Sequence, residues 1–141
     1  MRRRRDVPDR LREPARAFAG MAGELERAKA ELLLAIPAAR TAAVPLAEAL
    51  LAFREGLDRA AAGMDAWRTP ELDAEWARCA AGIDAARTAE VALRLRPGNL
   101  PHDQLLFALQ DLIAPLQAFE DAARRWDSLR AIVGGDAPPG W

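Results

Sequence analysis

The sequence is short of the residues on which most catalytic and metal-binding chemistry depends. Its 141 residues include one cysteine (Cys79), one histidine (His102), one serine (Ser128) and no tyrosine. Zinc sites need several Cys or His ligands and ferritin-like di-iron centres need two Glu-x-x-His pairs, so both classes are excluded. The chain also lacks the Gly-x-Ser-x-Gly segment of serine hydrolases and the Gly-x-x-x-x-Gly-Lys loop that cradles phosphates. We therefore expect no metal and no cofactor.

Long apolar runs and disulfides are missing as well. With a single cysteine no internal disulfide can form, which suits a reducing compartment, and we predict a cytoplasmic location. The most hydrophobic stretch, 32–53, is interrupted by prolines, Arg40 and Glu48, so we predict no membrane span. Polar residues 6–16 follow the opening arginines where a secretory signal needs an apolar segment. The excess of arginine over the lone lysine suggests a GC-rich, bacterial genome.

What the chain does contain favours helices. Alanine, leucine, arginine and glutamate are abundant and β-branched residues are scarce. Proline divides the chain into four segments, and each carries apolar residues at alternating spacings of four and three. These rows contain Leu11, Phe18, Ala22, Leu25, Lys29, Leu32 and Ile36; Leu46, Phe53, Leu57 and Trp67; Leu72, Trp76, Cys79, Ile83 and Glu90; and Leu105, Leu109, Leu116, Phe119, Ala123, Trp126 and Arg130. We predict an all-α, antiparallel up-down-up-down four-helix bundle with helices near 11–36, 45–67, 70–95 and 101–133.

Proline and glycine mark the expected helix ends. Pro14 and Pro45 suit the first turns of the first two helices. Thr69 followed by Pro70 is typical of an N-cap and a first helical position. Gly63 offers an earlier end for the second helix.

Charge separates a basic start from an acidic body. Residues 1–16 carry seven arginines against three acidic residues, a balance of +4, while the rest of the chain has a balance of −5. We predict a basic arm over 1–10, the bundle over 11–133 and a flexible Gly/Pro-rich tail over 134–141. We expect the arm to be a solvated charge run. The alternatives are contact with nucleic acid through Arg2, Arg3, Arg4, Arg5, Arg10 and Arg12, contact with an anionic membrane, or a targeting role.

Polar residues within the apolar rows are the candidates for a special role. Lys29 and Glu90 occupy row positions at nearly equal heights in the first and third helices, if rise is counted at ~1.5 Å per residue. Because an unpaired buried charge is costly, the simplest expectation is that they pair. Pro115 should bend the fourth helix and bring Gln110 and Asp111 toward the same level. We predict a polar layer in the core that fixes register, with a ligand or proton-handling site as the alternative.

The segment "RPGNLPH" (96–102) resembles the Arg-x5-His motif of HEPN-type ribonucleases, which are also helical bundles. The resemblance covers seven residues, and Pro97 stands where that family usually has a polar residue. It implies metal-independent cleavage of RNA by Arg96 and His102.

The segment "QDLIAPLQAF" (110–119) resembles the His-Asp-Leu-x-x-Pro-Leu box of histidine kinase dimerisation helices. Gln110 occupies the phosphoacceptor position, so phosphotransfer by that route is excluded. What the resemblance leaves is a helix bent by proline.

Basic residues near the second and third helix ends define a possible anion site. Arg40, Arg94, Arg96 and His102 would surround the free backbone N–H groups at the start of the fourth helix. Alternatively, these side chains are simply solvated.

The pattern as a whole favours a non-enzymatic protein. Four complete apolar rows and no catalytic constellation predict a bundle that acts by protein–protein association, as a scaffold, adaptor or regulatory subunit. The partner is then another protein or a second copy of the chain. The alternatives are a nucleic-acid-binding module that uses arm residues 2–16 and the ribonuclease above.

Overall fold

The computed structural model describes the backbone of residues 6–38, 44–95 and 102–133, and the side chains of residues 10–35, 46–95 and 104–129. Every regular element within these ranges is helical, which confirms the all-α prediction. The α-helices are α1 (Asp6–Ala38), α2 (Val44–Ala62), α3 (Asp73–Arg94), α4 (His102–Ile113) and α5 (Gln117–Val133). Short 3-10 helices cover η2 (Met64–Trp67), η3 (Pro70–Leu72) and η4 (Ala114–Leu116).

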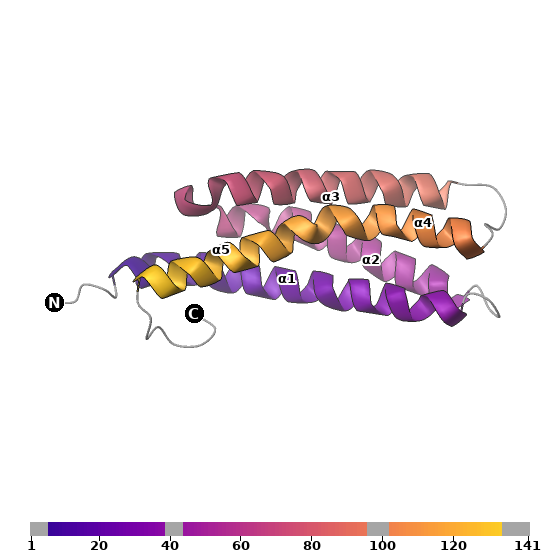
Figure 1. The fold of residues 1–141 in the computed structure, drawn as a ribbon, viewed down its shortest axis with the longest axis horizontal. Coiled ribbons are helices and arrows are strands. Elements are labelled where there is room, and N and C mark those ends of the chain that lie inside the picture. The colour runs from indigo at the N-terminus through magenta and orange to yellow at the C-terminus, as the bar shows by residue number, and fades with distance from the viewer. Residues whose placement is uncertain (1–5, 39–43, 96–101, 134–141) are drawn as a thin grey trace.

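These helices form four rods along one long axis: α1, α2, α3, and α4 continued by α5 (Figure 1). Consecutive rods run in opposite directions. α1 packs against α2 and α5, whereas α3 packs against α2, α4 and α5. α1 and α3 therefore occupy opposite corners of the bundle. We call the end where α1 begins and α5 ends the terminal end, and the end where α1 and α3 end and α4 begins the far end.

α1 begins earlier than the sequence suggested. It starts at Asp6, so residues 6–10 of the expected arm are helical and Pro14 lies in the helix interior rather than in its first turn. Acidic residues stabilise the positive N-terminal end of a helix dipole, which favours a start at Asp6. Pro8 falls in the first turn, where its missing N–H needs no partner.

The second helix ends at Ala62, at the earlier of the two expected positions. The Gly63 N–H donates to the carbonyl of Arg59 at 3.0 Å, and η2 follows. Thr69 does precede Pro70 at the start of η3 with extended backbone, but its hydroxyl makes no capping hydrogen bond. The expected N-cap is therefore correct in position only.

Pro115 interrupts the fourth rod as predicted. α4 stops at Ile113, Pro115 lies in η4, and α5 continues at an angle that carries it toward α1 (Figure 1). The bend brings the Pro115 carbonyl against α3 at Gly82. A Cβ atom at Gly82 would lie 2.3 Å from that oxygen, so only glycine permits the approach.

The buried rows differ from the expected ones by one residue at several positions. In α1, Ala28 and Ala35 are buried where the predicted row had Lys29 and Ile36, so Lys29 lies at the edge of the row. In α5, Ala122 and Leu129 are buried where the predicted row had Ala123 and Arg130. The seven-residue repeat itself holds in α1: Phe18, Leu25 and Leu32 are buried, and a buried residue follows each of them after three positions instead of four.

Four aromatic rings fill the core toward the terminal end. Phe18 meets Trp67 edge-on with ring centroids 4.9 Å apart, and lies 6.2 Å from Phe119 and 6.3 Å from Trp126. Such pairs add to the free energy gained from burying apolar area.

Candidate functional site

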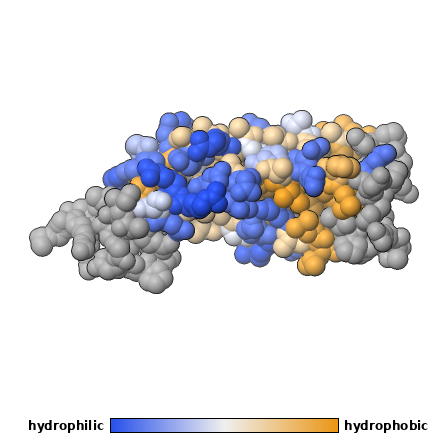
Figure 2. Space-filling view, viewed as in Figure 1, coloured by the Kyte–Doolittle hydropathy of each residue, from blue (hydrophilic) through white to orange (hydrophobic). Residues whose placement is uncertain are grey.

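Large apolar side chains are exposed in the half of the bundle toward the far end. Leu34, Leu95 and Phe107 are 77%, 74% and 70% exposed. The full set, which we call the apolar patch, is Leu33, Leu34, Leu51, Val91, Leu95, Leu106 and Phe107. Figure 2 shows hydrophobic surface gathered toward this end of the visible face, while the surface toward the terminal end is mostly hydrophilic. All four rods contribute to the patch.

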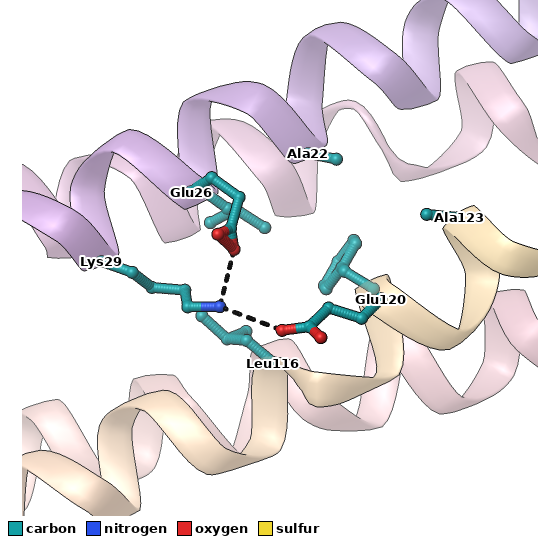
Figure 3. A pocket seen from close by; sticks show the side chains of 8 residues that line it. Ala22, Glu26, Lys29, Leu116, Glu120 and Ala123 are labelled. Carbon is teal, nitrogen blue, oxygen red and sulfur yellow. Dashed lines mark hydrogen bonds and ion pairs between the residues drawn. The ribbon is translucent and has the colours of Figure 1, made fainter.

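A pocket of about 300 Å³ opens between α1 and the rod formed by η4 and α5 (Figure 3). Its floor consists of core side chains, among them Leu25, Leu116 and Phe119. Ala22 and Ala123 leave space because they are small.

Lys29 spans the mouth of this pocket. Its Nζ lies 2.7 Å from a carboxylate oxygen of Glu26 and 3.6 Å from one of Glu120, between the two helices (Figure 3). The Lys29 side chain is 13% exposed, whereas both carboxylates face solvent. Glu120 also accepts a hydrogen bond from the Gln117 amide at 3.2 Å. Lys29 is thus paired on both sides, and its contact with Glu120 ties α1 to α5.

A second concavity, of about 270 Å³, runs between α2 and α3. We call it the α2–α3 groove; it is lined by Ala47, Leu50, Leu51, Arg54, Glu90, Leu93 and Arg94. Glu90 lies on its floor with a side chain only 5% exposed, and both carboxylate oxygens accept hydrogen bonds from Arg94 at 3.1 Å. This bidentate bond accounts for the buried charge.

The predicted polar layer is wrong. Lys29 pairs with Glu26 and Glu120, and Glu90 pairs with Arg94. α1 and α3 lie at opposite corners of the bundle, and Lys29 lies at the edge of the α1 row, where it reaches Glu120 of α5. Gln110 and Asp111 are exposed on α4. Of the four candidates only Glu90 is buried.

The predicted anion site and catalytic pair fall largely outside the described side chains. Arg40, Arg96 and His102 lie there, although the backbone of His102 does begin α4 as expected. Arg94 is described, and it is bonded to Glu90.

The predicted nucleic-acid arm is only partly described. Arg2, Arg3, Arg4 and Arg5 lie outside the described residues. Arg10 forms a bidentate ion pair with Glu71 of η3, and that hydrogen bond lowers the pKa of Glu71 and raises that of Arg10. Arg12 is half-buried on α1. Arg10 is thus engaged within the protein.

Reactive groups are scarce in the described part of the chain. Cys79 is fully buried, and burial raises the pKa of its thiol to about 12, so the nucleophilic thiolate is rare at neutral pH. No three His, Cys, Asp or Glu side chains among the described residues are grouped as metal ligands. None of the described helices has the length and apolar character needed to cross a bilayer.

The apolar patch was not predicted from the sequence. Phe107 could have been recognised, because Leu105, Leu109 and Leu112 define the row of its helix that faces the core and Phe107 falls on the opposite side. The α2–α3 groove could not be recognised in this way, since it depends on which helices are neighbours.

Comparison with protein-family models, curated proteins and solved structures finds no match to the chain.

Proposed function

We propose that this protein acts by protein–protein association through the apolar patch. The observation that carries the proposal is the exposure of seven large apolar side chains toward one end of the bundle. Large apolar side chains that are exposed together at one end of a bundle are candidates for an interaction site, because covering them with a partner removes apolar surface from water. We expect the partner to be met in the cytoplasm, the compartment that a lone buried cysteine suits.

The charges near the patch support a protein partner over nucleic acid. Described ionic side chains in that half are of both signs, with Glu31, Glu48, Glu90 and Asp111 against Arg54, Arg87 and Arg94. A phosphate backbone requires an excess of positive charge, whereas a desolvated protein interface favours aromatic and aliphatic side chains. Phe107 is the natural anchor, because an exposed aromatic ring supplies large contact area with few rotatable bonds.

Site-specific photo-crosslinking tests the proposal. A benzophenone amino acid replaces Phe107 in one variant and Arg78, exposed on α3 near the terminal end, in a matched control. We expect discrete covalent protein adducts from position 107 in living cells and few from position 78. Equal yields at both positions, or no adduct at 107, would contradict association through the patch.

A further inference from the structure

The α2–α3 groove is small and mostly apolar. Leu50 and Leu93 are half-buried in its lining, while Ala47 and Leu51 are exposed. On α2 the lining extends from Ala47 to Arg54, which corresponds to roughly 10 Å of helix. Its volume of about 270 Å³ is close to the lower limit for small-molecule sites, so the groove suits one slender ligand.

Arg54 gives the groove an unbalanced positive charge. Of the two arginines in the lining, Arg94 is neutralised by its two hydrogen bonds to Glu90. Arg54 is half-buried, yet its side chain forms no ion pair or hydrogen bond within the described part of the chain. Asp58, one turn further along α2, is paired instead with Arg87 of α3 at 3.0 Å. The groove therefore lacks one negative charge beside Arg54.

The apolar lining and the unbalanced charge together select an anion with an apolar tail. A carboxylate is the best counter-ion for a guanidinium, because it accepts two parallel N–H bonds. Covering the lining with an apolar chain is favourable, because it removes apolar surface from water. A cation with the same tail would be repelled by Arg54, and a neutral ligand would leave Arg54 without a counter-ion.

The lining favours an alkyl chain over a peptide. A peptide brings backbone N–H and C=O groups, which need hydrogen-bond partners when they are buried. The residues that line the groove are alanine, leucine, arginine and glutamate, and none of them offers an uncharged hydrogen-bonding side chain. An alkyl chain has no polar group to satisfy, so it can fill the groove without leaving a donor or acceptor unpaired.

We propose that the α2–α3 groove binds a medium-chain fatty acid, with the carboxylate on Arg54 and the alkyl chain over Leu50, Leu51 and Leu93. This ligand site goes beyond association through the apolar patch, with which it shares only Leu51. Octanoate is a suitable probe, because its extended chain is about as long as the roughly 10 Å of helix along which the groove runs.

NMR titration of the isotope-labelled full chain measures the dissociation constant and shows which residues respond. We expect octanoate to bind at one site with a dissociation constant of ~0.1–1 mM and to shift the Arg54 side-chain signal. Octan-1-ol has the same chain without the charge and should bind roughly tenfold more weakly. Arg54→Gln should remove this preference for octanoate while leaving octan-1-ol binding unchanged, which a merely structural role of Arg54 would not do.

A second variant and two matched controls separate the groove from general stickiness. Leu51→Asp places a negative charge in the path of the alkyl chain and should weaken octanoate binding roughly tenfold or more. Leu34→Asp makes the same change at an exposed leucine on α1, outside the groove, and should have no effect. Arg27→Gln removes an exposed arginine of α1 and should likewise leave the dissociation constant unchanged. Circular dichroism confirms that every variant remains helical.

Several results would overturn the fatty-acid site. These are a wild type without saturable octanoate binding, equal affinities for octanoate and octylammonium, or an Arg54→Gln variant that binds octanoate as tightly as the wild type. An acetylated tripeptide with a C-terminal leucine that binds more tightly than octanoate would assign the groove to a peptide carboxylate instead. Photo-crosslinking at position 107 reports on α4, so the failure of this site and the failure of association through the patch are distinguishable.

Discussion

The two ends of this bundle are built differently. Toward the terminal end, four aromatic rings interlock and the segments are tied together across the surface: Arg10 pairs with Glu71, and Arg68 stacks over the Trp76 ring at 4.0 Å. The Trp76 indole also donates to the Met64 carbonyl at 2.8 Å. Toward the far end the described core is aliphatic apart from Phe53, and leucines and a phenylalanine face outward.

The contrast between the two ends links the terminal end to folding stability and the far end to association. An aromatic side chain buried at the terminal end contributes to folding because it leaves water when the chain folds. Phe107 remains in water when the chain folds, so it contributes free energy only when something else covers it. Substitutions at the two ends should therefore change different measurements.

The largest effect on folding is expected at Trp67. This side chain is fully buried, and Trp67→Ala should lower the free energy of unfolding by ~3–5 kcal/mol. Phe107→Ala, measured in the monomer at low protein concentration, should change it by less than ~0.5 kcal/mol. Urea denaturation compares the two. Similar losses would mean that Phe107 packs within the chain.

Gly82 should give the next largest effect. Gly82→Ala places a Cβ against the Pro115 carbonyl, and the resulting displacement of α3 from η4 should cost ~1–3 kcal/mol. Gly20 is the matched control, because nothing lies within 4 Å of a Cβ built there. Gly20→Ala should stabilise α1 by roughly 0.5–1 kcal/mol, since alanine is the better helix former. Thermal melts of both variants test the close approach, and a neutral Gly82→Ala would contradict it.

Double-mutant cycles on Lys29 test the arrangement midway between the ends. Lys29 and Glu120 should couple by less than ~1 kcal/mol, because the carboxylate is exposed to solvent. Lys29 and Glu90 should be additive, since each has another partner. A coupling of several kcal/mol between Lys29 and Glu90 would contradict this packing and would mean that the two residues pair in the core, as the sequence suggested.

The smallest effect should come from the Arg10–Glu71 pair at the terminal end. Its hydrogen bond lowers the pKa of Glu71, so the pair stabilises the fold above the unfolded-state value of about 4.3 and loses that contribution as pH falls through the lowered folded-state value. Arg10→Met should remove this part of the acid sensitivity. Because both side chains are partly exposed, we expect a change under ~1 kcal/mol at neutral pH. Unfolding curves between pH 3 and pH 7 measure it, and an unchanged pH profile would contradict the assignment.

The positions of the helices could be predicted from the sequence, because they depend on local preferences. Scarce β-branched residues favoured helices throughout, and Gly63 and Pro115 mark an end and a bend that the structure contains. Heptad spacing identified most core positions, among them Phe18, Leu57 and Leu116. In α1 it placed Lys29 in the core where Ala28 is buried, because spacings of three and four both fit the sequence and only packing chose between them.

Sequence by itself determined that this chain is helical, where its rods break and which face of each rod is apolar, because those properties depend on residues within a few positions of one another. Tertiary structure alone decided which rods are neighbours. The sequence places Lys29 and Glu90 at nearly the same height, but diagonal packing of α1 and α3 gave each another partner. The same packing placed Arg54 and Arg94 on opposite sides of one groove and left Phe107 uncovered. These contacts join residues far apart along the chain, which local preferences do not specify.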